Sequence, residues 1–251
     1  MKSIAIIPAR FASTRFPGKP LAQIMGKTMI ERVYRQAEKC AKFNGIWVAT
    51  DDERIIREVE KFGGNVVKTS PDCPSGTDRC AEALQKLGIN ADLIVNIQGD
   101  EPFIRPVQLD QIVDLMEKTK AQIGTLCKRI SEKSAVFNPN VVKVVKSSQG
   151  KALYFSRNPV PYVRGSESGE WVQIADFFKH IGLYAYRTDA LLEINQLPPG
   201  KLELAESLEQ LRWLEAGYSI YVGETNWESI GIDTPEDLKW AEDNWVEISA
   251  E

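Results

Sequence analysis

Histidine and closely spaced cysteines are scarce in this 251-residue sequence, which limits the chemistry that it can support. His180 is the only histidine, and the four cysteines are scattered without a Cys-x-x-Cys pair. A zinc site or a serine triad would have to be built around that one imidazole, so we expect neither. We expect the cysteines to be reduced thiols rather than a disulfide framework. Any bound metal should be a hard cation held by oxygen ligands.

Long hydrophobic runs and a positive net charge are also absent. The sequence has no run of about eighteen apolar residues and no basic, apolar and small-residue leader. We therefore expect a soluble, cytoplasmic protein with no membrane partner. Lysine and arginine number 31 against 35 acidic residues, a formal net charge of −4, so we expect no nucleic-acid partner.

A regular alternation of apolar runs and amphipathic segments is what the sequence does contain. The predicted strands cover residues 4–7, 45–49, 65–68, 92–97 and 122–126. The predicted helices cover residues 28–41, 55–62, 78–87 and 107–118. This alternation predicts an α/β fold with a Rossmann-like open sheet, mixed but mostly parallel, and helices on both faces. No Gly-x-Gly occurs, so the usual dinucleotide fingerprint is missing.

The second half of the chain is less regular. Strands are predicted at 141–146, 152–155, 180–186 and 219–222, and one helix at 203–214. The polar, Gly/Ser-rich stretch 163–170 predicts a mobile loop or a dimer arm. No linker or repeat divides the chain. We therefore predict a single domain over residues 1–251, with an inserted antiparallel or dimerisation segment around 150–190.

The most distinctive stretch runs from Ser3 to Pro20. Its apolar run ends at Pro8, which we expect to end the strand because proline lacks a backbone N–H. The following loop carries Arg10, Arg15 and Lys19 among small residues. Open α/β sheets bind ligands in loops at the carboxyl ends of their strands, so this loop suits a polyphosphate. A solvated basic loop is the alternative for any one of these cations.

Residues 8–20 resemble the signature loop of sugar-activating cytidylyltransferases. Their sequence is Pro-Ala-Arg-Phe-Ala-Ser-Thr-Arg-Phe-Pro-Gly-Lys-Pro. It most resembles the 3-deoxy-manno-octulosonate (Kdo) cytidylyltransferases; the sialic acid branch typically continues after Pro-Ala-Arg with Gly-Ser-Lys and ends in Lys-Asn. In the family this loop wraps the CTP phosphates. The resemblance implies nucleotide contacts from Pro8, Ala9, Arg10 and Lys19, with catalytic roles for the last two. It extends from Ser3 to Leu238 and implies a homodimer of similar fold.

The segment Pro-Ser-Gly-Thr-Asp-Arg, residues 74–79, precedes a predicted helix. An ordinary helix N-cap explains these residues without any ligand. The segment also resembles the Ser-Gly-Thr-Glu-Arg element of the Kdo enzymes, with Asp78 in place of their usual Glu. That element lines the cytosine and ribose pocket, so the resemblance implies that Ser75, Gly76 and Thr77 bind the nucleotide. Arg79 is interpreted as a structural partner.

Two acidic residues are candidates for holding a metal ion. Asp100 follows an apolar strand, where a carboxylate reaches the ligand edge of the sheet. Asp233 stands just before a helix that Thr234, Pro235 and Asp237 can begin without it. The resemblance implies that these two carboxylates bind Mg²⁺ and are catalytic, and that Gln98 lies near the sugar and the nucleotide. The chain departs from the family just before this second motif, where Glu-Ser-Ile replaces the frequent Thr-Gly.

A further group of residues matches family elements that contact the acid sugar. Arg157 suits a two-point grip on a carboxylate, and His180 and Tyr184 fall on one face of a predicted strand. A lone strand histidine is more often a satisfied core residue. The acid-sugar site that the resemblance implies consists of Arg15, Gln98, Arg157, His180, Tyr184, Glu209 and Gln210.

Taken with these residues, the resemblance implies an enzyme that activates Kdo with CTP and releases pyrophosphate, for lipopolysaccharide synthesis. The closest alternative is a cytidylyltransferase for another acid sugar, such as 8-amino-Kdo or a sialic-type nonulosonate. A glycosyltransferase normally has an Asp-x-Asp triplet, which this sequence lacks. The alternative of a different class is a non-catalytic protein that binds CTP without releasing pyrophosphate.

Overall fold

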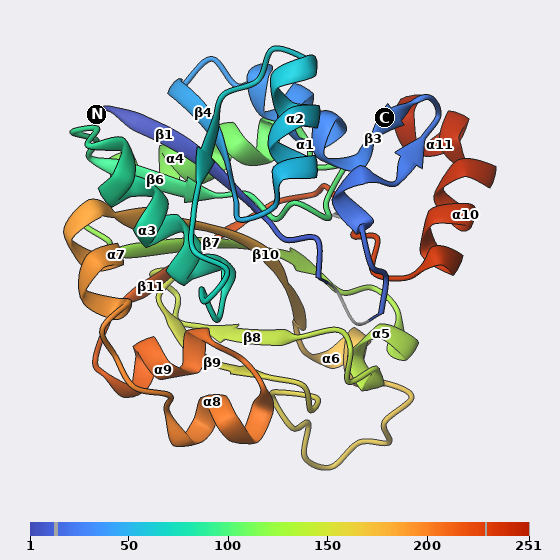
Figure 1. Ribbon diagram of the computed structural model, residues 1–251. Coiled ribbons are helices and arrows are strands. Elements are labelled where there is room, and N and C mark those ends of the chain that lie inside the picture. The colour runs from blue at the N-terminus through green and yellow to red at the C-terminus, as the bar shows by residue number, and fades with distance from the viewer. Residues whose placement is uncertain (13–14, 229, 251) are drawn as a thin grey trace. The chain divides into compact units, whose positions relative to one another are not determined.

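The computed structural model describes residues 1–12, 15–228 and 230–250 (Figure 1). Contacts group the chain into two compact units, Met1–Val113 with Ser229–Glu251, and Asp114–Glu228. The first unit thus contains both ends of the chain. No helix among the described residues has the length and apolar character needed to cross a membrane. The predicted single domain with an inserted segment stays a prediction.

The first unit is built on a parallel sheet. Its strands are β1 (Ser3–Ala9), β4 (Phe43–Thr50), β5 (Val66–Lys68) and β6 (Leu93–Asn96). The unit also contains a separate, short antiparallel pair, β2 (Gln23–Ile24) and β3 (Lys27–Thr28). The order is β6-β1-β4-β5, with every neighbouring pair parallel. Its helices are η1 (Lys19–Leu21), α1 (Met29–Glu38), α2 (Glu53–Lys61), α3 (Gly76–Leu87), α10 (Pro235–Asp243) and α11 (Trp245–Ala250), and α4 (Pro106–Lys118) leads into the second unit.

Strand β1 is the centre of this sheet. Ile4, Ile6 and Ile7 are fully buried, as a strand flanked on both sides requires. The prediction that the strand ends at Pro8 is wrong, because β1 continues to Ala9. Pairing with β6 stops at Ile6, whereas pairing with β4 continues to the end of the strand. At Pro8, therefore, one side of β1 has no neighbouring strand in this unit. The N–H that proline lacks would have had no strand to bond to on that side, so no hydrogen bond of the sheet is lost.

The second unit holds a mixed arrangement of strands. These are β7 (Ile123–Arg129), β8 (Lys143–Lys146), β9 (Ala152–Ser156), β10 (Phe178–Arg187) and β11 (Ile220–Glu224). Strand β7 lies between β11, which is parallel to it, and β10, which is antiparallel; β8 pairs antiparallel with β10 and β9. The helices are α5 (Lys133–Phe137), α6 (Trp171–Ile174), α7 (Thr188–Ile194), α8 (Lys201–Glu206) and α9 (Gln210–Glu215).

The helix predicted over 203–214 is two helices. Helices α8 and α9 are separated at Ser207, whose φ of 52° places it in the left-handed region. The Arg157 guanidinium donates hydrogen bonds from Nε to the Glu206 carbonyl at 2.7 Å and from Nη2 to the Ser207 carbonyl at 3.3 Å. These contacts take up carbonyls at the break, and they come from a residue about 50 positions away. The sequence analysis also did not predict the short helices α5, α6, α7 and α11.

The α/β class is confirmed, with parallel pairing in the first unit and mixed pairing in the second. Contacts show that α1, α2 and α3 pack on the strands of the first unit. Residues 163–170 contain neither helix nor strand, which agrees with the predicted loop. All four cysteines are free, as expected.

Candidate active site

A cavity of about 230 Å³ opens at the carboxyl ends of β1 and β6 in the first unit. Its lining residues are Pro8, Ala9, Arg10, Arg15, Lys19, Cys73, Pro74, Ser75, Gly76, Arg79, Gln98, Gly99, Asp100 and Asp233. The structure therefore brings together every predicted nucleotide and metal residue except Thr77, which is buried in the first turn of α3. Parallel strands end at one edge of their sheet, and ligands bind at that edge.

Two glycines allow the walls of this cavity to approach each other. A Cβ on Gly99 would lie 2.7 Å from the carbonyl oxygen of Pro8, a distance that backbone atoms cannot relieve easily. A Cβ on Gly76 would lie 3.3 Å from the Pro8 ring. The ends of β1 and β6 and the start of α3 therefore meet around Pro8, leaving main-chain groups close to any ligand.

Ser75 begins helix α3. Its hydroxyl oxygen accepts a hydrogen bond from the Asp78 N–H at 3.1 Å, and Asp78 Oδ2 accepts one from the Ser75 N–H at 3.0 Å. This is a complete capping box, so the N-cap interpretation of the motif is confirmed, and Asp78 fills the family's usual Glu position in it. The positive end of the α3 dipole consequently faces the cavity. Nucleotide binding by Ser75, Gly76 and Thr77 stays a prediction.

Lys19 joins the two predicted metal ligands. Its Nζ lies 2.7 Å from Asp100 Oδ2 and 3.0 Å from Asp233 Oδ1, although the two acids are 133 positions apart in the sequence. Arg15 Nη1 is 3.1 Å from the other oxygen of Asp233. Only 13% of the Lys19 side chain is exposed, against 33% for Asp100 and 46% for Asp233. Two half-buried carboxylates thus converge on one ammonium ion at the cavity.

The position of Asp233 depends on packing beneath it. Ile232, fully buried, belongs to an apolar cluster with Phe103 and Ile248, and its N–H donates to the Asp100 carbonyl at 2.9 Å. The Thr234–Asp237 capping box forms as predicted, and Asp237 also accepts the Asp233 N–H at 3.0 Å. The Asp233 carboxylate therefore takes no part in capping and is directed to Lys19.

The carboxylate pair fits a divalent cation of the magnesium type. Among the described residues no group of three or more His, Cys, Asp or Glu side chains converges as a closed metal site. Mg²⁺, however, is typically held by one or two carboxylates together with substrate phosphates and water. Asp100 and Asp233 each direct a carboxylate oxygen at the same positive group, the Lys19 ammonium. The Mg²⁺ assignment stays a prediction.

The predicted acid-sugar residues divide between the units. Arg15 and Gln98 line the cavity. Arg157, His180, Tyr184, Glu209 and Gln210 all belong to the unit Asp114–Glu228. The Arg157 guanidinium donates to the carbonyls of Glu206, Ser207 and Pro139, which gives it a structural role there. Sugar contacts by these residues stay a prediction.

His180 lies among aromatic rings on β10. Its Nε2 is 3.0 Å from the Thr125 hydroxyl, and its ring centre is 5.1 Å from that of Phe155 and 5.3 Å from that of Tyr184. Loss of hydration in this setting lowers the pKa of His180 to about 3. The ring is therefore neutral near neutral pH and does not act as a cation.

The His180 pKa predicts an acid-sensitive stability. The unfolded chain binds a proton below about pH 6.5 whereas the folded His180 does not, so stability falls as pH decreases through this range. Between pH 6.5 and 5 we expect this group to reduce the free energy of unfolding by about 1.6 kcal/mol. Urea unfolding of the protein and of His180→Gln at both pH values tests this. The variant should lose most of the slope, and equal slopes in both proteins would contradict the prediction.

Cys73, Pro74, Arg79 and Gly99 line the cavity but were not predicted as site residues. Pro74 and Arg79 belong to the 74–79 motif itself, in which Arg79 was interpreted as a structural partner, and Cys73 directly precedes that motif. Phe11 was missed as well. The Arg54 guanidinium, held by Asp52, lies 3.2 Å from the centre of the Phe11 ring and so anchors the start of the basic loop. No sequence spacing indicates that contact.

Comparison with known proteins identifies the family. A family model described as Cytidylyltransferase matches residues 4–224. The 3-deoxy-manno-octulosonate cytidylyltransferases of Parabacteroides distasonis and Cytophaga hutchinsonii are 56% and 55% identical to this chain, covering 96% and 94% of it and 97% and 94% of their own lengths. A solved structure of CMP:2-keto-3-deoxy-manno-octonic acid synthetase complexed with CTP is 41% identical, covers 98% of this chain and 99% of its own, and superposes with a TM-score of 0.91. The chain belongs to the 3-deoxy-manno-octulosonate cytidylyltransferase family and is a nucleotidyltransferase with that family's α/β fold.

Proposed function

We propose that this protein activates Kdo with CTP, giving CMP-Kdo and pyrophosphate. The observation that carries the proposal is the cavity in which Lys19 lies between Asp100 and Asp233, with Arg10 and Arg15 in the same lining. Cations beside paired carboxylates suit a substrate that brings phosphates and a divalent ion together. The anomeric hydroxyl oxygen of Kdo forms a bond to the α-phosphorus, the bond to the β-phosphate oxygen breaks, and the hydroxyl proton passes to solvent.

The side chains of this chain contribute positioning and charge. Arg10 and Lys19 offset the negative charge that develops on the departing pyrophosphate. Lys19 must then exchange its carboxylate partners for phosphate oxygens, and a flexible ammonium group held by two half-buried acids can do so. Asp100 and Asp233 would then be free to hold Mg²⁺. When bound, that ion supplies neutralisation of the α-phosphate and a lower pKa for the attacking hydroxyl.

A pyrophosphate-release assay with CTP, Mg²⁺ and Kdo tests the proposal. We expect pyrophosphate and CMP-Kdo in equal amounts, with the sugar nucleotide identified by mass. CTP binding without pyrophosphate would instead support the non-catalytic alternative. A panel of acid sugars, including 8-amino-Kdo and a sialic acid, decides the substrate; a higher kcat/KM for either of these would replace Kdo in the proposal.

Arg157→Lys tests the acid-sugar site. Lysine cannot reproduce a planar two-point grip on a carboxylate, so we expect KM for Kdo to rise at least about tenfold with little change in the Kd of CTP. Steady-state kinetics and isothermal titration measure the two effects.

The matched control for Arg157 is Arg187→Lys. Arg187 also donates to backbone carbonyls, those of Met116, Thr119 and Ala121, but belongs to no predicted sugar element. Both variants should lose stability, and only Arg157→Lys should affect Kdo. An equal loss for both ligands in Arg157→Lys would assign that arginine to the fold alone.

We further propose a cytoplasmic homodimer that serves lipopolysaccharide synthesis. CMP-Kdo supplies a sugar for that polymer, and CTP is a cytoplasmic metabolite. The segment predicted for dimerisation exposes three large apolar side chains, Leu153, Tyr162 and Ile174, at 59%, 75% and 58%. A second copy would shield such side chains. Sedimentation at micromolar concentration should give the mass of two chains, and a monomer would contradict the dimer.

A further inference from the structure

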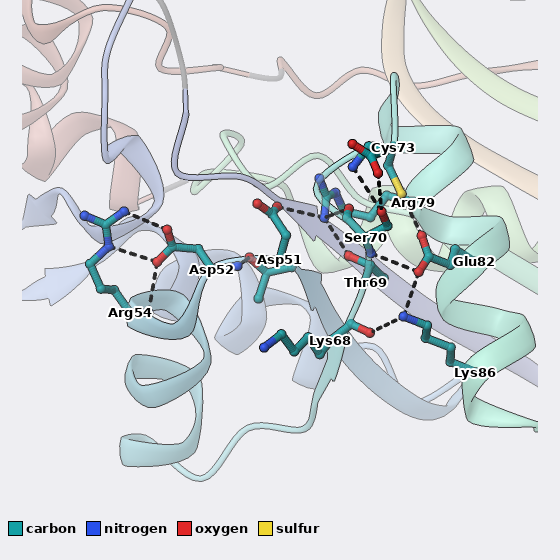
Figure 2. A network of polar contacts seen from close by, with 12 residues as sticks. Asp51, Asp52, Arg54, Lys68, Thr69, Ser70, Cys73, Arg79, Glu82 and Lys86 are labelled. Atoms are coloured by element: carbon teal, nitrogen blue, oxygen red, sulfur yellow. Dashed lines mark hydrogen bonds and ion pairs between the residues drawn. The ribbon is translucent and has the colours of Figure 1, made fainter.

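One wall of the cavity is a loop without regular structure. Residues 69–75 connect β5 to α3 and contribute Cys73, Pro74 and Ser75 to the lining. An irregular segment cannot rely on a strand or helix ladder for its position. The Thr69 N–H donates to the Thr50 carbonyl at 2.9 Å at the start of this segment. Side chains that reach it from neighbouring elements add further support, and two of them are on α3 (Figure 2).

Arg79 holds the start of the loop. Its guanidinium side chain is only 5% exposed, and Nη1 lies 2.9 Å from Asp51 Oδ1 just beyond β4. The same nitrogen donates to the Thr69 hydroxyl at 2.5 Å and to the Ser70 carbonyl at 3.3 Å. The contacts in Figure 2 thus tie three elements together, namely the end of β4, the loop and the first turn of α3.

Glu82, one turn further along α3, holds the middle of the loop. Its Oε1 accepts the Ser70 N–H at 2.9 Å and its Oε2 accepts the Cys73 thiol at 2.9 Å. Lys86 Nζ lies 2.7 Å from Oε1, the oxygen that also accepts the Ser70 N–H. The S–H group is a weak donor, but a charged acceptor strengthens its hydrogen bond, so this carboxylate contributes to holding Cys73 beside α3.

We propose that Arg79 and Glu82 are positioning residues that preorganise the 69–75 loop as a wall of the nucleotide site. The inference rests on the proposed function of the cavity as a CTP site. If the loop already has its binding conformation before CTP arrives, it loses little conformational entropy on binding, and the affinity for CTP is higher. Loosening the wall should therefore weaken nucleotide binding and leave the rate of the bound complex nearly unchanged.

Glu82→Gln with Lys86→Gln as control tests this. Both changes remove the Glu82–Lys86 ion pair, but only the first removes the charge that Ser70 and Cys73 contact. We expect Glu82→Gln to raise KM for CTP about tenfold with kcat within about twofold. Lys86→Gln should leave both parameters within about twofold. Thermal unfolding of each variant shows whether the change is local or global.

Alkylation of Cys73 by iodoacetamide gives a second readout that does not depend on turnover. Burial and the hydrogen bond to the Glu82 carboxylate raise the pKa of the Cys73 thiol to about 12. Replacing the carboxylate by an amide lowers that pKa, so Cys73 should be alkylated several-fold faster at pH 8 in Glu82→Gln than in Lys86→Gln. Peptide mass spectrometry separates Cys73 from the other three cysteines, which are buried.

KM for CTP and the rate of Cys73 alkylation separate the positioning role of Glu82 from the proposed use of the cavity as a CTP site. Loss of CTP affinity in Glu82→Gln with faster Cys73 alkylation supports the positioning role. Unchanged KM and unchanged alkylation relative to Lys86→Gln would overturn it. If the unaltered protein binds no CTP, the proposed function and the nucleotide role of the loop are both overturned. The alkylation rates would still report whether Glu82 holds Cys73.

Discussion

UTP is expected to support the reaction with a kcat/KM about 10⁴-fold lower than that of CTP. Main-chain segments of β1 and of the α3 N-terminus form the cavity walls at Pro8, Ala9, Ser75 and Gly76. The β1 ladder and the Ser75–Asp78 capping box hold these segments rigidly. Fixed acceptors that read the cytosine amino group would face the uracil carbonyl oxygen instead, and buried groups left unpaired are costly.

Steady-state kinetics with both nucleotides at saturating Kdo measures this discrimination. KM for Kdo should be similar with either nucleotide, since the sugar contacts do not change with the base. Ser75→Ala tests whether the rigid start of α3 is needed for this discrimination. Loss of the N-cap lowers stability by about 1 kcal/mol and loosens the start of α3. Its CTP/UTP ratio should therefore be smaller. Comparable kcat/KM values for CTP and UTP in the unaltered protein would remove the claim.

Asp100→Asn and Asp233→Asn are each expected to lower kcat/KM at least about 100-fold, or roughly 3 kcal/mol of transition-state stabilisation. Asparagine preserves the shape of each side chain but removes the charge that Mg²⁺ requires. Lys19 loses one of its two partners in either variant, so the fold should survive on the remaining ion pair. Raising Mg²⁺ should restore only part of the activity.

The double variant of Asp100 and Asp233 and a matched control test whether the two acids bind the same Mg²⁺ ion. Changing both acids should cost less than the sum of the two single effects, because removing one ligand already disables the shared ion. Asp237→Asn changes a carboxylate four residues from Asp233 that accepts the backbone N–H groups of Asp233 and Thr234 at the start of α10. That control should lower the melting temperature and keep an ordinary Mg²⁺ dependence. Normal turnover of Asp233→Asn at ordinary Mg²⁺ would place Asp233 in the turn before α10 and outside the metal site.

The sequence by itself was sufficient to predict the family and the fold class. The family prediction from residues 8–20 is confirmed by the comparisons along nearly the whole chain. The alternation of apolar runs predicted the α/β class, because a strand buried on both faces needs a continuous apolar run and an amphipathic helix needs a 3.6-residue repeat. Caps were predicted equally well at Ser75 and Thr234, since a cap involves residues only three positions apart.

Only the tertiary structure decided which charged groups meet. Lys19 pairs with acids 81 and 214 positions away, and the break at Ser207 is held by an arginine 50 positions earlier. No local period encodes such pairs, because they arise when the ends of separate strands and loops converge at one edge of a sheet. The same reason explains why Arg157 suggested a sugar ligand in the sequence but contacts backbone carbonyls in the fold. It also explains why nothing in the sequence indicated that the Glu82 carboxylate accepts a hydrogen bond from Cys73 in the lining of the cavity.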